Sequence, residues 1–144
     1  MATRKEHDFL GELEIPDEVY YGVQTFRALE NFHITGVPLS REPLFVKALG
    51  HVKKAAALAN RDCKVLDATV AEYISRASDR VIAGEFNDQF PSDLIQGGAG
   101  TSVNMNANEV IANVGLEMMG KNKGEYDFIH PNNHVNCSQS TNDA

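Results

Sequence analysis

Apolar residues recur at intervals of three or four in three long segments of the chain, the spacing of amphipathic helices. The first such helix is predicted to begin after Ser40, a residue that can cap it, with Pro43 in its first turn. Gly50 weakens this helix, which indicates close packing against a neighbour. Its apolar face is predicted to consist of Phe45, Ala48, Leu49, Val52, Ala56 and Ala59.

Two further helices follow the same spacing. One starts after Asp67, a good N-cap residue, and ends near Gly84. The other begins at about Thr101 and stops at Gly120. Their predicted apolar positions are Val70, Tyr73, Ile74, Ala77 and Val81 in the first, and Val103, Ala107, Val110 and Val114 in the second.

The N-terminal part shows a different periodicity. Residues 9–15 alternate between apolar and acidic side chains and predict a short strand that ends at Pro16. Residues 20–25 fit a second short strand or an irregular turn, and residues 27–32 fit a helical turn. Residues 85–100 and 121–136 are rich in Gly, Pro or Asn and are predicted to be loops. The pattern therefore predicts a mainly α fold with a short N-terminal β element.

Composition places the chain among ordinary globular domains. Its 144 residues suit one domain with a real core, and the net charge of −7 argues against nucleic acid as a partner. No apolar run is long enough for a membrane span, and the first residues lack the apolar stretch of a secretory signal. Cys63 and Cys137 lie in no metal-binding spacing. We therefore expect a cytoplasmic protein with reduced thiols.

A glycine-rich island at residues 96–102 precedes the third helix. Gly97, Gly98 and Gly100 allow close approach of the backbone to a ligand, and the first N–H groups of a helix suit an anion. Thr101 is placed to cap the helix or to point its hydroxyl at a ligand. The lysine of a P-loop is absent, and the dinucleotide fingerprint is incomplete. A simple capped loop is the alternative interpretation.

A second polar island spans residues 138–143. Ser140, Thr141 and Asn142 offer two hydroxyls and a carboxamide, neutral groups that can bind a carboxylate. The alternative is a cluster that only caps a helix. Together the two islands indicate half of a pocket for a small anionic molecule.

Four asparagines, Asn104, Asn106, Asn108 and Asn113, follow within the third predicted helix. Asparagine is a mediocre helix former, so this density indicates a buried and paired polar face. We favour a hydrogen-bonded interface over ligand contact, with Asn104 and Asn108 on the same side of the helix.

His130 and His134 lie four residues apart, but Pro131 and the neighbouring asparagines favour a turn. No cysteine or glutamate completes a metal set nearby, so no metal site is predicted. The sequence also contains no nucleophile elbow and no paired-carboxylate site. The pattern of residues alone therefore identifies no catalytic group.

Several specific motifs occur in the same order as in one enzyme family. The chain resembles the N-terminal part of the aspartases (aspartate ammonia-lyases) in the aspartase/fumarase superfamily. Tyr21-Gly22, the Gly-Gly-Ala-Gly-Thr run ending at Thr101, and the run 140–143 each favour the aspartases over the fumarases. The matching segments are residues 10–16, 20–28, 31–32, 87–90, 96–113, 130–132 and 139–143.

This resemblance implies reversible deamination of L-aspartate to fumarate and ammonia by anti-elimination through an aci-carboxylate. It also implies that Ser140 and Thr141 bind a carboxylate, the β one, while Thr101 and Asn142 contact the amino group or the same end of the substrate. His130 and Asn132 match the secondary anion site of some fumarases, although Asn133 departs from the aspartate often found there.

The family's catalytic base is a serine on a mobile loop farther along the chain, in a homotetramer whose active sites draw on three subunits. We therefore expect no catalytic residue here, and expect that the chain alone is inactive. No cofactor is expected, and activation by a divalent cation is left open. Residues 1–137 would form the N-terminal lyase domain, and residues 138–144 the truncated start of the central helical bundle.

Three alternatives stay open. The nearest is a fumarate hydratase or a related lyase of the superfamily. The second is a non-catalytic folding or interaction domain, and the third is an anion-binding module that acts alone.

Overall fold

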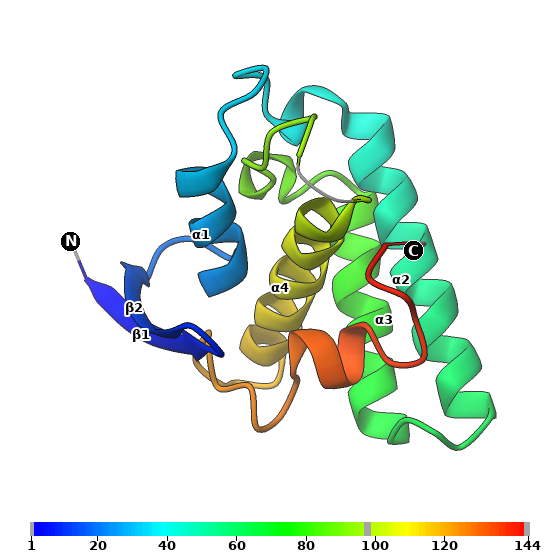
Figure 1. Ribbon diagram of the computed structural model, residues 1–144. Helices are drawn as coiled ribbons and strands as arrows, with labels where there is room; N and C mark the ends of the chain where they lie inside the picture. The colour runs from blue at the N-terminus through cyan, green and yellow to red at the C-terminus, as the bar shows by residue number, and fades with distance from the viewer. Residues whose placement is uncertain (1, 97–98, 143–144) are drawn as a thin grey trace.

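The computed structural model describes residues 2–96 and 99–142. A hairpin of β1 (Thr3–Asp8) and β2 (Gly11–Pro16) lies at one side of a helical body (Figure 1). The strands are antiparallel, with Arg4 opposite Ile15. The predicted strand is thus confirmed as β2. Its partner β1 was not predicted, because its side chains are mostly charged or polar. The mainly α fold with a short β element is confirmed.

Helix α1 (Val23–Asn31) packs against the hairpin and against α4 (Thr101–Met118). It includes the helical turn predicted from residue 27, whereas the strand alternative for residues 20–25 is wrong. The helix begins earlier because carboxylates that are distant in sequence accept hydrogen bonds from its first N–H groups, as described below.

Helices α2 (Pro43–Asp62) and α3 (Ala68–Ile82) form an antiparallel pair, which the 3-10 helix η1 (Leu39–Arg41) precedes. A Cβ at Gly50 would lie 2.8 Å from Cγ1 of Ile82, which confirms the predicted close packing. Asp67 caps α3, as expected, by accepting from the N–H groups of Thr69 and Val70.

The predicted apolar face of α2 is wrong except at Leu49. Phe45 is 46% exposed and Val52 is 42% exposed. The helix is rotated so that the side chain of Lys53 is buried, and the reason lies in its polar partners described below. The buried residues of α2 are Val46, Leu49, Gly50, Lys53, Ala57 and Asn60.

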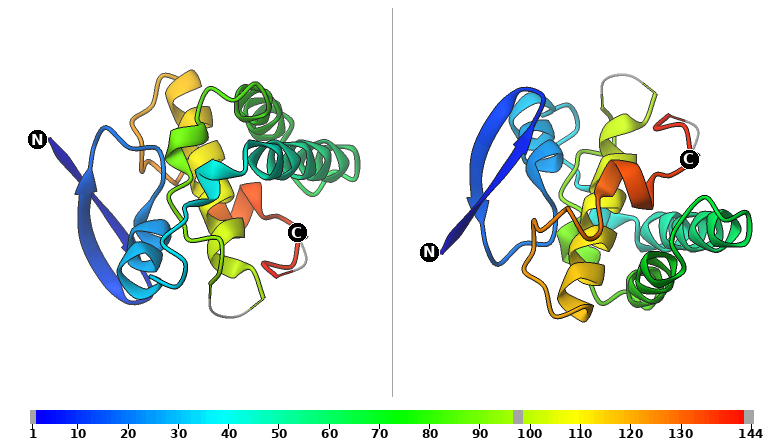
Figure 2. Two further views of the ribbon diagram at one scale, coloured as in Figure 1. Left: turned by 90° about the horizontal axis from the view of Figure 1, so that it is seen from above. Right: turned by 90° about the horizontal axis from the view of Figure 1, so that it is seen from below.

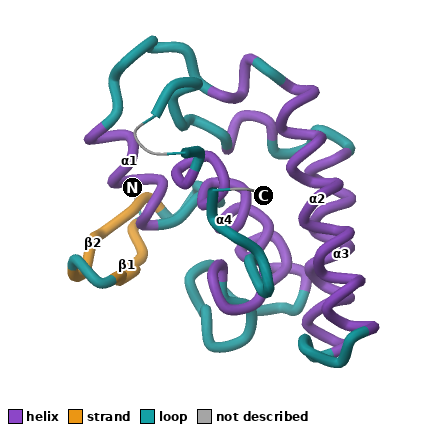
Figure 3. Tube along the Cα trace, turned by 45° about the vertical axis from the view of Figure 1, so that its right-hand side comes forward, coloured by secondary structure: helices purple, strands orange, loops and turns teal. Residues whose placement is uncertain are grey.

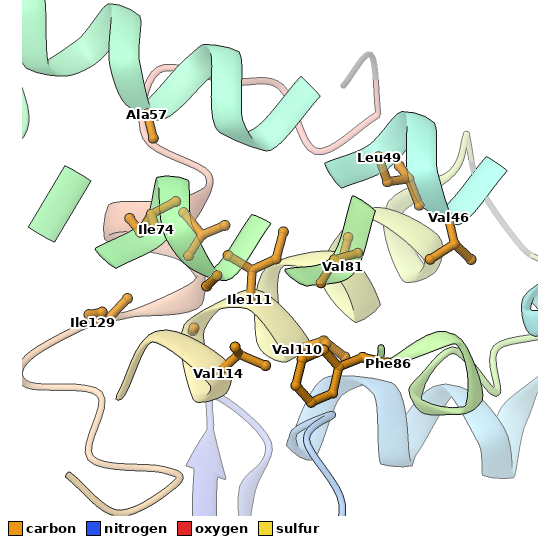
Figure 4. Packing of buried hydrophobic residues seen from close by; sticks show 14 of the residues in the cluster. Val46, Leu49, Ala57, Ile74, Val81, Phe86, Val110, Ile111, Val114 and Ile129 are labelled. Atoms are coloured by element: carbon orange, nitrogen blue, oxygen red, sulfur yellow. The ribbon is translucent and has the colours of Figure 1, made fainter. Parts of the chain in front are cut away.

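Helix α4 runs through the middle of the molecule, with the hairpin and α1 on one side and α2 and α3 on the other (Figure 3). Every residue from 103 to 116 is buried. Val110, Ile111 and Val114 of α4 belong to one buried apolar cluster with residues of α2 and α3 and with Phe86 (Figure 4). The four asparagines of α4 are also buried, as predicted.

Two short helices complete the described chain, η2 (Asn87–Gln89) and the π-helical turn η3 (Pro131–Val135). Both lie in segments predicted to be loops. The turn η3 forms because Nδ1 of His130 accepts hydrogen bonds from the N–H groups of Asn132 and Asn133.

After η3, the C-terminal segment returns to lie beside the start of α4 (Figure 2). A domain boundary between residues 137 and 138 stays a prediction, and residues 143 and 144 lie outside the described part. Among the described residues, no helix has the length and apolar character needed to cross a membrane.

Candidate functional site

The two polar islands meet at the start of α4. The hydroxyl of Thr101, the first residue of the helix, donates to Oδ1 of Asn142 at 2.5 Å. Gly100 has φ of +104°, and a Cβ there would lie 3.7 Å from the carbonyl oxygen of Asn142. The left-handed backbone of Gly100 thus turns the chain into α4 close to the second island. Gly97 and Gly98 lie outside the described residues.

The remaining residues of the second island follow closely. The N–H group of Asn142 donates to Oγ of Ser140 at 3.2 Å, and Ser140 is exposed. Thr141 between them is half-buried. The structure therefore brings Thr101, Ser140 and Asn142 together, with Thr141 in the same short segment. Substrate contact by these side chains stays a prediction.

Capping of α4 differs from the prediction at Thr101. Gly100 occupies the N-cap position and makes no side-chain cap. Instead, Oε1 of Gln96 accepts from the N–H group of Val103 at 2.9 Å, which leaves the Thr101 hydroxyl to bind Asn142. The first island therefore supplies its own cap, and this role of Gln96 was missed.

Beneath the islands lies a buried polar group that we call the lysine cluster: Lys53, Asn104, Asn136 and Gln139. The ammonium of Lys53 donates to Oδ1 of Asn104, to Oδ1 of Asn136 at 3.2 Å and to Oε1 of Gln139 at 2.8 Å. An ammonium has three N–H bonds, so all of its donors find an acceptor. The cluster joins α2, α4 and the segment that leads into the second island.

The asparagines of α4 extend this interface. Asn104 and Asn108 both donate to Oδ1 of Asn136, at 2.9 and 3.1 Å. Asn106 donates to the carbonyl oxygen of Gln89 at 2.9 Å. The expectation of a paired polar face is confirmed, with Asn104 and Asn108 on one side. Oδ1 of Asn108 is a buried oxygen without a partner among the described residues.

Lys53 carries an unusual charge environment. Its side chain is fully buried, and none of the ion pairs among the described residues includes it. Burial lowers the pKa of Lys53 to about 8, because desolvation disfavours the charged form. This role could not be predicted from the sequence, since lysine usually lies at the surface.

A second buried group, the glutamate cluster of Glu6 and Glu109, lies on the opposite side of α4. Glu109 accepts from the N–H groups of Gly22, Gln24 and Thr25 and from the Thr25 hydroxyl, at 2.6–3.1 Å. These groups form the start of α1. Burial raises the pKa of Glu109 to about 7, although the Thr25 hydroxyl opposes this shift.

Glu6 completes the glutamate cluster. Its Oε2 accepts from the N–H group of Val23 at 3.0 Å and from the Tyr126 hydroxyl at 2.9 Å. Nε of Arg4 donates to Oε1 of Glu6 at 2.8 Å. Both carboxylates thus cap α1, and sequence reasoning missed them because they come from β1 and α4.

A cavity of about 280 Å³ adjoins this cluster, between the hairpin, α1, α4 and η3. His130, Asn132 and Asn133 line it, as do Glu109 and Tyr126. The N–H group of His130 donates to Nδ1 of His134 at 2.9 Å. Burial lowers the pKa of both imidazoles, which favours their neutral forms.

His130 and Asn132 of the predicted secondary anion site therefore share one cavity wall. Anion binding there stays a prediction. Within the described ranges, no group of three or more His, Cys, Asp or Glu side chains is arranged to hold a metal ion.

Comparison with known proteins identifies relatives over nearly the whole chain. A family model described as "Lyase" matches residues 11–144. The aspartate ammonia-lyase of Bacillus sp is 63% identical over 99% of this chain and 30% of its own length. The corresponding enzyme of Escherichia coli (strain K12) is 55% identical over 98% of this chain and 30% of its own.

Solved structures agree. A fumarate lyase:delta crystallin from Brucella melitensis superposes with a TM-score of 0.96 and 53% identity over 98% of this chain and 32% of its own. A class II fumarase from Schistosoma mansoni gives a TM-score of 0.86 and 34% identity over 97% and 29%.

The chain spans about 30% of the length of the aspartate ammonia-lyases that it matches. Within that region, the match extends through both polar islands and the central helix. The chain therefore belongs to this lyase family of the fumarase superfamily, and it corresponds to the N-terminal region of aspartate ammonia-lyases.

Proposed function

We propose that this chain is the N-terminal part of a cytoplasmic enzyme that reversibly deaminates L-aspartate to fumarate and ammonia. Identity of 55–63% to aspartate ammonia-lyases, against 34% to a class II fumarase, supports this substrate over malate. The observation that carries the proposal is the hydrogen bond between Thr101 and Asn142, which brings together two polar segments 41 residues apart.

In this proposal the four neutral side chains of the islands bind the substrate. Ser140 and Thr141 donate to the β-carboxylate, where negative charge grows when a proton leaves Cβ. Pre-placed donors that meet growing charge are among the largest contributions to catalysis. Thr101 and Asn142 hold the amino group or the same end of the substrate. The partial positive charge at the start of α4 adds to the attraction of the carboxylate.

The remaining functions come from elsewhere in the enzyme. The serine base lies outside these residues, and the active enzyme is a homotetramer. His130 and Asn132 bind a second anion in the cavity of about 280 Å³. The chain alone is consequently inactive, because it holds only part of the substrate and has no base.

A hybrid enzyme tests the substrate. In it, these 144 residues replace the matching region of the Bacillus sp enzyme, which is 63% identical. We expect the hybrid to release fumarate from L-aspartate, measured by ultraviolet absorbance, and the isolated chain to release none. Turnover of malate in place of aspartate would identify a fumarase, and turnover by the isolated chain would refute the predicted inactivity.

Thr141→Ala in the hybrid tests the site. Loss of one β-carboxylate donor should lower kcat about 10²-fold, as for other oxyanion donors, without lowering the melting temperature. Thr69→Ala, at an exposed position of α3, is the matched control and should leave turnover unchanged. Unchanged kinetics in Thr141→Ala would remove this residue from the mechanism.

A further inference from the structure

Lys53 is among the largest side chains that are completely buried in the described part of the chain, and it is a cation. Its hydrogen-bond partners among the described residues are neutral amide oxygens, with no carboxylate. Burying a charge costs free energy that a neutral side chain of similar size would avoid. Strongly desolvated ionisable groups concentrate at functional sites. Packing alone therefore does not explain why a lysine occupies this buried position.

The lysine cluster holds the segment that leads to the second island. Lys53 binds the side chains of Asn136 and Gln139, and Gln139 directly precedes Ser140. Gln139 in turn donates from Nε2 to the carbonyl oxygen of Val135 at 2.9 Å. The chain between η3 and Ser140 is thereby fixed from both sides.

The charge also lies close to the first island. Lys53 donates to Asn104, whose own N–H group donates to the carbonyl oxygen of Gly100 in the first turn of α4. Asn104 follows Thr101 by three residues, about 4.5 Å along the helix axis, so the ammonium is bound at the first turns of α4. Solvent and salt screen a buried charge poorly, so its field acts on the start of this helix.

We infer that Lys53 is a positioning residue of the aspartate site: it fixes the segment that carries Ser140 to Asn142, and its buried positive charge favours ligands with two carboxylates. This inference rests on the proposed function, and it adds a source of charge selectivity to a set of donors that are otherwise neutral. A role in packing alone would predict equal losses for ligands of any charge.

The test compares two ligands of the hybrid enzyme that differ by one charge. Succinate has two carboxylates, and succinamate has one carboxylate and one amide. Calorimetric titration gives a Kd for each without turnover. Lys53→Met should raise the Kd of succinate about tenfold more than that of succinamate. The reason is that succinamate has one negative charge fewer for the ammonium to attract.

Two further variants separate charge from packing. Asn104→Asp keeps the ammonium and gives it a carboxylate partner, so it neutralises the charge; we expect the same loss of preference for succinate. Lys54→Met removes the half-buried neighbouring lysine, which pairs with Asp79, and should change neither Kd. Circular dichroism and melting temperature check that each variant is folded.

The outcomes distinguish this inference from the proposed function. If the hybrid is active but Asn104→Asp and Lys53→Met leave the ratio of the Kd values of succinate and succinamate unchanged, the inference alone is overturned. Failure of the unaltered hybrid to bind succinate would overturn both the inference and the proposed function.

Discussion

The two buried charged clusters, which lie on opposite sides of α4, have different roles. In the glutamate cluster, Glu109 accepts from Gly22, Gln24 and Thr25 at the start of α1, where helical N–H groups and the helix dipole favour a negative charge. In the lysine cluster, Lys53 is bound by side chains from two separate segments, without help from a helix terminus. The first cluster begins a helix, whereas the second joins distant parts of the chain.

Charge compensation differs as well. The glutamate cluster has Arg4 as a counter-ion, with Nε 2.8 Å from Oε1 of Glu6. The lysine cluster has no acidic side chain in contact among the described residues. We therefore expect the glutamate cluster, which has a counter-ion, to stabilise the fold. We expect the positive charge of the lysine cluster, which has none among the described residues, to attract an anionic ligand. The following predictions test this contrast.

The largest effect is expected at the glutamate cluster. Glu109→Ala leaves the N–H groups of Gly22, Gln24 and Thr25 buried without an acceptor, and should lower the free energy of unfolding by about 3–5 kcal/mol. Urea unfolding of the hybrid measures this. Glu117→Ala, an exposed position on the same helix, should cost less than ~1 kcal/mol. Similar losses in both variants would contradict a structural role for Glu109.

The two clusters should also give opposite pH dependences. The pKa of Glu109 is raised from 4.5 to about 7, so its contribution to stability is full below pH 4.5 and is lost as pH rises through 7. The pKa of Lys53 is lowered from 10.5 to about 8, so its contribution is full above pH 10.5 and is lost as pH falls through 8.

Each change is on the order of 3 kcal/mol at most. The difference in unfolding free energy between each variant and the unaltered hybrid, measured across the pH range, separates these two changes from those of other titrating groups. Glu109→Gln should remove the fall in stability near neutral pH, and Lys53→Met should remove the rise in alkali. A fall that persists unchanged in Glu109→Gln would assign it to another group.

The smallest effects distinguish close packing from backbone strain. A Cβ at Gly22 would lie 2.6 Å from Oε2 of Glu6, so Gly22→Ala should destabilise by about 2–3 kcal/mol. At Gly100 the Cβ would find room, and only φ of +104° opposes it, so Gly100→Ala should cost about 1 kcal/mol. Thermal unfolding measures the loss of stability in each variant. A larger loss in Gly100→Ala than in Gly22→Ala would show that backbone strain costs more than close packing at these sites.

The same contrast explains what sequence could predict. Helices α3 and α4 follow from local periodicity, and Asp67 is the expected cap of α3. The runs of polar residues and glycines located both islands. The buried face of α2 could not be predicted, because an apolar-periodicity argument assigns Lys53 to solvent. Its amide partners lie 51 to 86 residues away. The start of α1 could not be predicted for a related reason, because Glu109, which caps it, lies 84 to 87 residues away in the sequence.

The lysine cluster also has a consequence for the order of events during synthesis. Lys53 must wait for acceptors that are 51, 83 and 86 residues farther along the chain. At about 5–20 residues per second, a ribosome needs roughly 4–17 s to add the last of them. Until then the ammonium remains hydrated, and α2 cannot complete its buried face. The nascent chain therefore acquires its most deeply buried charge only after nearly all of these residues have been made.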